Sequence, residues 1–204
     1  MKLAMKHILT PATLVLCVFG ALSQEVIPPE QLEKVVPRLI ERASDQENLP
    51  LKVDGDAANA FGMSAKNHGA LLIPNKGLSA EALQKPAKDV VVLGQLWMKD
   101  LSPAVEGKTV EADKLRLVKI ALKEEEHQLP LLLLGVQKKD DRAELLVFGR
   151  GPEPLLTLPF KKINLKQEKP LELDMRRVSD DLGAVDVSVL GQFKAEITVG
   201  LLTR

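Results

Sequence analysis

Alternating apolar and polar residues mark the C-terminal part of the chain as β-structure. In three consecutive segments every second residue is apolar, and the residues between them are mostly polar or charged. Such alternation is typical of antiparallel strands with one face in the core and the other in water. It predicts, for example, that Val187 points into the core and Asp186 into water. The three segments are residues 171–178, 184–190 and 193–199.

Earlier apolar runs extend this pattern toward the N-terminus. Polar turn residues separate them, and no helical periodicity lies between them after residue 88. Short strands at regular spacing favour a sandwich or barrel over a parallel sheet. The sequence therefore predicts a mainly β fold, an antiparallel β-sandwich of about eight strands. The five earlier strands are expected at residues 90–98, 115–122, 131–136, 143–148 and 155–160.

The leucine run at residues 131–134 is apolar at every position, unlike the alternating strands. It is too short to cross a bilayer as a helix, which needs about 20 residues. The sequence QKKDDR that follows places charges at a turn, and a second apolar run returns at residues 143–148. We expect a pair of core strands whose second face is covered by another element, with the N-terminal helix as the candidate cover.

Helical periodicity appears near the start, where residues 32–40 carry apolar side chains on one stripe. Pro37 lies within the stripe and lacks a backbone donor, so this helix is expected to be broken or bent there, or to start late. The following residues are rich in Gly, Asn, Asp and Pro, with a short strand expected at 70–73 and a helix from the cap Ser79 to Gln84. We expect a helical and irregular attachment at 24–87 and the β-sandwich domain at 88–204.

The first 23 residues have the three parts of a secretory signal peptide. Lys2 and Lys6 form the basic start, residues 8–22 the apolar stretch, and small residues precede Gln24. We expect cleavage before Gln24, an exported protein that is periplasmic or secreted, and no membrane span after cleavage. Retention as an uncleaved anchor is one alternative. A lipid anchor on Cys17 is another, although the residues before it are not small.

Composition removes several classes of function. Basic and acidic residues balance at 28 each, so no net field favours nucleic acid as a partner. Cys17 is the only cysteine, so the mature chain is expected to have no disulfide, thiolate metal site or cysteine nucleophile, and no cofactor is predicted. The sequence Gly107-Lys108-Thr109 matches the end of a phosphate-binding loop, but Ser102 stands where that motif needs glycine. Nucleotide binding is therefore not expected.

Two weak metal candidates contain oxygen or nitrogen ligands. Asp54, Asp56 and Asn59 offer oxygens of the kind that calcium prefers, but their spacing does not match an EF-hand loop, and Asp-Gly is more often a turn. Glu126 and His127 could share a metal ion, although adjacent acids at a strand end usually form a solvated edge. No metal site is predicted, and Asp54 and Asn59 stay as weak ligand-binding candidates.

A hydrolase needs a nucleophile, a base and an orienting group in contact. Ser64 and His68 lie close in sequence, and Asp56 or Asp54 could complete such a set, but the surrounding residues match no nucleophile motif. Trp97 is a further weak ligand-binding candidate, because its indole N–H needs a partner. The sequence therefore predicts an exported, non-catalytic binding or structural module with a protein or cell-envelope partner. The alternative is a small exported hydrolase that uses the loop from Ser64 to His68.

Overall fold

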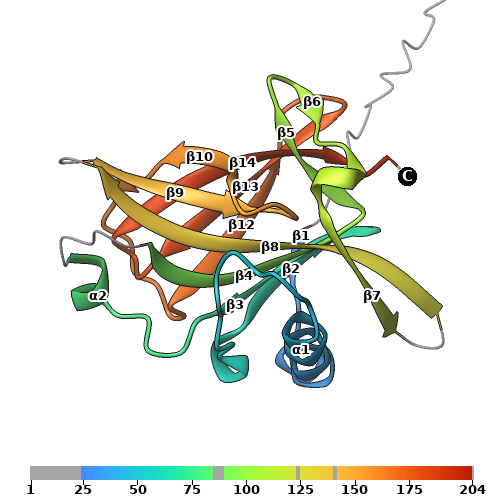
Figure 1. Cartoon of the computed structure of the whole chain (residues 1–204), viewed down its shortest axis with the longest axis horizontal. Coiled ribbons are helices and arrows are strands. Elements are labelled where there is room, and N and C mark those ends of the chain that lie inside the picture. Colours follow the sequence, from blue (N-terminus) through green and yellow to red (C-terminus); the bar gives the residue numbers. More distant parts are fainter. Residues whose placement is uncertain (1–23, 85–89, 123–124, 140–141, 204) are drawn as a thin grey trace, which may run out of the picture.

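Two antiparallel sheets and one long helix form three layers in the computed structural model (Figure 1). The structure describes residues 24–84, 90–122, 125–139 and 142–203. The predicted signal peptide lies outside these ranges. The sheets pack against each other in a sandwich, so the predicted mainly β, antiparallel fold is confirmed.

The larger sheet has eight strands among the described residues, in the order β1-β2-β3-β4-β8-β9-β10, with β7 also paired to β8. Strand β8 is long enough for one of its edges to pair with both β7 and β9, while its other edge pairs with β4. Its residue Leu131 pairs with Trp97 of β4 on one side and with Arg116 of β7 on the other. The strands are β1 (Gln24–Val26), β2 (Phe61–Ala65), β3 (His68–Pro74), β4 (Val91–Lys99), β7 (Arg116–Leu122), β8 (Glu125–Lys139), β9 (Arg142–Phe148) and β10 (Pro154–Pro159).

The smaller sheet has six strands among the described residues, in the order β12-β13-β14-β5-β6, and β11 also pairs with β14. The chain passes from the larger to the smaller sheet between β4 and β5. Asp100 adopts a left-handed backbone conformation at this crossing, with φ of 55°. The strands are β5 (Leu101–Val105), β6 (Lys108–Thr109), β11 (Lys161–Lys162), β12 (Leu171–Arg177), β13 (Leu182–Val189) and β14 (Phe193–Leu201).

Both faces of the larger sheet are buried around β8, which explains why its leucine run is apolar at every position. In β8, Leu132 and Leu134 belong to the core between the two sheets, whereas Leu131 and Leu133 belong to a second core on the opposite face. Helix α1 (Pro29–Ser44) covers that second face through Val36 and other buried residues. The expected role of the N-terminal helix as a cover is confirmed.

Helix α1 runs without interruption from Pro29 to Ser44, with Pro37 inside it. The expected break and the alternative of a late start are therefore wrong. Pro29 occupies the first turn, where its missing N–H costs little, and the apolar stripe faces the sheet. Pro37 is exposed, so its ring lies on the solvent side of the helix, and packing of the apolar stripe against the sheet holds the helix together.

The segment before residue 88 contains more strand than the sequence pattern predicts. Besides the short helix α2 (Ala80–Gln84), whose Ala82 N–H donates to Ser79 Oγ at 3.3 Å as expected for a cap, it contributes β1, β2 and β3 to the larger sheet. Strand β3 pairs directly with β4. The expected division at residues 87 and 88 thus falls between two neighbouring strands of one sheet.

All eight strands predicted from apolar patterning are present, with ends shifted by a few residues. The largest difference is β8, which begins at Glu125, six residues before the leucine run. Its first half pairs with β7 as a hairpin arm, and this arm carries polar residues that gave no strand signal. The expected turn after the leucine run is bracketed by the pair Lys139 and Arg142, and residues 140–141 lie outside the described ranges.

Candidate functional site

The hairpin formed by β2 and β3 carries Ser64 and His68, the pair expected to matter in a hydrolase. The register places Ser64 opposite Gly69 and His68 opposite Ala65. Because side chains alternate along a strand, Ser64 lies on the face that α1 covers, and His68 on the face toward the smaller sheet. The structure does not bring these two side chains together.

Asp56, the expected third member of that set, lies at the far end of β3. Its backbone N–H donates to the carbonyl of Pro74, the last residue of the strand, whereas His68 is the first. Seven extended residues span about 20 Å, so the carboxylate of Asp56 is remote from the imidazole. Asp56 Oδ2 instead accepts a hydrogen bond from Asn59 Nδ2 at 2.7 Å.

The remaining oxygen candidates have partners within the loop. Asp54 Oδ1 lies 2.9 Å from Lys76 Nζ, and the Asp54 backbone N–H donates to Asn75 Oδ1 at 2.9 Å. These contacts join the segment after α1 to the end of β3. Asp54 and Asn59, the weak ligand-binding candidates, thus take part in local bonds that order the loop.

Trp97 is buried in the layer beneath α1, with 2% of its surface exposed. Its indole N–H donates to Gln95 Oε1 at 3.0 Å, and both side chains lie on the same face of β4. The partner that the indole was expected to need is therefore within the core. Trp97 offers no exposed aromatic face to a ligand.

Glu126 and His127 are neighbours in β8, so their side chains lie on opposite faces of the hairpin arm. Glu126 pairs with Lys119 at 3.0 Å, and His127 Nε2 lies 3.7 Å from Glu125 Oε2. Within the described ranges, no three His, Cys, Asp or Glu side chains gather in a way that could hold a metal ion. The same part of the chain contains no helix with the length and apolar character needed to cross a bilayer.

The fragment that matched the end of a phosphate-binding loop lies in the β5–β6 hairpin. Gly107-Lys108-Thr109 forms the turn and return of the β5–β6 hairpin, with left-handed backbone at Glu106 and Gly107, where φ is 51° and 80°. A phosphate-binding loop opens a helix at this point of its motif, whereas Thr109 ends a strand.

A different region, which the sequence patterns did not indicate, combines a surface hollow with a partly buried arginine, Arg116. The hollow has a volume of about 430 Å³ and lies between the 3₁₀ turn Ala112–Lys114 and the loop from β9 to β10. Gly149 allows this close approach, because a Cβ atom there would lie 2.6 Å from the carbonyl oxygen of Lys114. The Arg150 N–H donates to the same oxygen at 3.0 Å.

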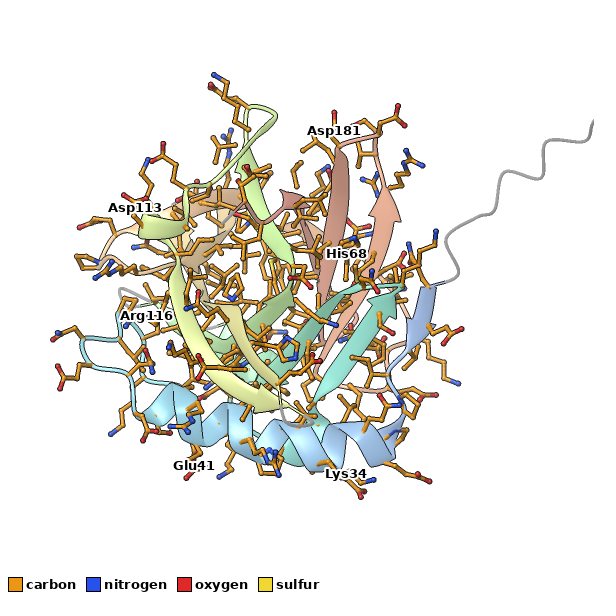
Figure 2. The ribbon with its side chains drawn as sticks, turned by 90° about the vertical axis from the view of Figure 1, so that its right-hand side faces the viewer. Lys34, Glu41, His68, Asp113, Arg116 and Asp181 are labelled. Carbon is orange, nitrogen blue, oxygen red and sulfur yellow. The ribbon has the colours of Figure 1, made fainter. Side chains whose placement is uncertain are left out.

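Arg116 lies directly behind this loop, on the same side of the molecule as Asp113 (Figure 2). Its guanidinium donates to the carbonyl oxygens of Arg150 at 3.0 Å, Glu47 at 3.1 Å and Asn48 at 3.3 Å. Its Nε is buried without a partner among the described residues. Burial, and secondly the charge of Arg150, lower the pKa of Arg116. Arg116 therefore ties the segment after α1 to the β9–β10 loop.

Sequence reasoning missed Arg116 because a lone arginine at the start of a strand carries no motif. The nearest signal was the sequence Gly149-Arg150-Gly151 between two predicted strands, which marks a tight loop with a basic side chain. Comparisons of the chain with protein-family models, curated proteins and solved structures give no match. The geometry of the described residues therefore carries the functional argument alone.

Proposed function

We propose that the protein is an exported, non-catalytic module that binds or supports a partner in the cell envelope or outside the cell. The observation that carries the non-catalytic part is the separation of Ser64 and His68 onto opposite faces of the β2–β3 hairpin. A serine nucleophile needs its base within hydrogen-bond distance, and a rigid strand register prevents that approach.

The three-layer framework supports a binding or structural role. Two cores fix the strands on both faces of the larger sheet, so the connecting loops are held on a rigid scaffold. Loops on such scaffolds are where recognition residues concentrate. The export part of the proposal rests on the basic, apolar and small-residue segments before Gln24.

Catalysis is tested by replacing Ser64 and His68 with Ala, singly and together, and assaying the parent and variants against a panel of short-chain esters. We expect equal, background rates for all four proteins. A parent rate well above background that falls in the double variant would overturn the non-catalytic assignment.

Export is tested by expressing the full chain in a host with a general secretion pathway and sequencing the N-terminus of the recovered protein. We expect recovery outside the cytoplasm with Gln24 as the first residue. Cytoplasmic protein that still begins with Met1 would contradict export without affecting the result on catalysis.

A further inference from the structure

Two guanidinium groups at the hollow beside the β9–β10 loop form no ion pair with the described residues. Arg116 is bound by three neutral carbonyl oxygens and forms no ion pair with the described residues. Arg150 extends from the loop into solvent and forms none with them either. A guanidinium that loses part of its hydration normally gains a carboxylate or phosphate partner. The partly buried guanidinium of Arg116 has neutral partners only, and the exposed Arg150 lies close enough for its charge to act on Arg116.

The other charged residues that line the hollow are Asp113, Lys114 and Glu153, and all three are exposed. Lys114 forms an ion pair with Glu111, whose Oε2 lies 3.5 Å from Lys114 Nζ. Asp113 and Glu153 are exposed, so water screens their charges. Glu153 forms no ion pair with Arg150, although the two residues are only three positions apart. The guanidinium of Arg150 is thus available to a ligand.

The loop is also fixed in place before any ligand arrives. The Arg150 N–H and carbonyl both have partners, Lys114 and Arg116, and Gly149 is packed against the 3₁₀ turn. A Cβ atom at Gly151 would meet nothing within 4 Å, so a ligand atom can approach the backbone there. A preformed loop reduces the ordering cost of binding.

We propose that this hollow binds the oxyanion group of a small molecule, with Arg150 as the direct contact and Arg116 as the positioning residue behind it. A phosphate or carboxylate group offers the paired oxygens that a guanidinium recognises. The volume of about 430 Å³ falls within the usual range for small-molecule sites, so the anion can belong to a larger ligand. This inference holds whether or not the chain is exported, because it rests on residues of the folded domain.

The test titrates inorganic phosphate, and separately acetate, into the protein of residues 24–204 at constant ionic strength set with chloride. Binding is followed by amide NMR shifts of Gly149 and Gly151 and by thermal melting. We expect saturable shifts at these two glycines and a rise of the melting temperature. The relative strength of phosphate and acetate distinguishes the two oxyanion classes.

Charge variants give effects of opposite sign. Arg150→Gln should weaken binding of the preferred anion at least tenfold, and Glu153→Gln should tighten it about two- to fivefold, because it removes a negative charge that lines the hollow. Arg142→Gln, an exposed arginine at the start of β9, is the matched control and should bind as the parent does. The Arg150 variant should fold, because the hydrogen bonds of Arg150 use its backbone and its side chain is exposed. No saturable shift with either anion, or equal affinity of the Arg150 variant and the parent, would overturn the proposal.

Discussion

Asp186 shows how a charged side chain on the outer face of a sheet becomes buried. It lies on the central strand of three, with Asp174 of β12 and Glu196 of β14 beside it in register. Lys194 Nζ lies 2.7 Å from Asp186 Oδ2 and Arg176 Nε lies 3.7 Å from it, so only 7% of the Asp186 side chain is exposed. The two cationic side chains stay partly exposed themselves, so the carboxylate is paired although it is buried.

Neutralising this carboxylate should therefore destabilise the protein. We expect Asp186→Asn to lower the free energy of unfolding by about 1–2 kcal/mol, because two cations lose a charge-assisted partner but can be rehydrated. Urea unfolding of the variant and the parent measures the difference. Asp174→Asn, the exposed register neighbour, is the control and should change stability by less than about 0.5 kcal/mol. Equal losses at the two positions would show that the Asp186 contacts contribute nothing.

Val187, the next residue along β13, points the other way and is fully buried between the sheets. Val187→Asp places a carboxylate where the described surroundings are apolar, so we expect a loss of more than about 4 kcal/mol. Thermal melting or the fraction of soluble protein measures this loss. A stable, soluble Val187→Asp protein would mean that water reaches the space between the sheets.

These two neighbours show what alternation predicts and what it leaves open. The pattern correctly predicted which way each side chain points, because a strand alternates its faces by geometry alone. It wrongly predicted that Asp186 is in water, since the side chains above it come from other strands whose register is not visible in the sequence. Strand register also decides the hydrolase alternative. Ser64 and His68 are close in sequence, but the register places them on opposite faces.

At the scale of elements, prediction succeeded where apolar residues recur with the period of a strand or a helix. Strands β12, β13 and β14 and the stripe of α1 follow their patterns closely. Strands β1, β2 and β5 were missed because they are short, and because β5 contains Pro103, which argues against a strand. Their pairing is decided by the neighbouring strands, and this information is not local.

The contribution of helix α1 to the core on the larger sheet can be tested by mutation. Leu39 is 1% exposed and packs with the apolar residues of that face, so Leu39→Ala should lower the free energy of unfolding by about 2–4 kcal/mol. Chemical denaturation measures the change. Lys34→Ala is the control on the outer side of the same helix (Figure 2), where a change below about 0.5 kcal/mol is expected. A Leu39 variant as stable as the control would show that the helix is dispensable for this core.

At the scale of the whole molecule, the layers are joined by contacts between residues that lie far apart in the sequence. Arg116 links the segment after α1 to the β9–β10 loop, and Lys169 Nζ donates to the carbonyl of Ala58 at 2.9 Å, which joins the start of β12 to the N-terminal part. Strands β3 and β4 pair along six positions between Gly69 and Lys99. The N-terminal part therefore completes the sheet as well as covering it.

This arrangement predicts that the chain cannot be divided at the boundary drawn from composition. A fragment of residues 88–204 keeps the smaller sheet and the pairing of β4 with β8, but it loses α1 and β3, so Trp97, Leu131 and Leu133 would face water. An exposed apolar face and a newly exposed edge of β4 favour aggregation. We expect the fragment to be insoluble or to lack dispersed amide NMR signals, whereas residues 24–204 should fold cooperatively. Adding a separate peptide of residues 24–84 during refolding should recover soluble protein, since it restores both the cover and β3. A monomeric, cooperatively folding fragment 88–204 would instead show that the sandwich is independent and that the N-terminal part is an attachment.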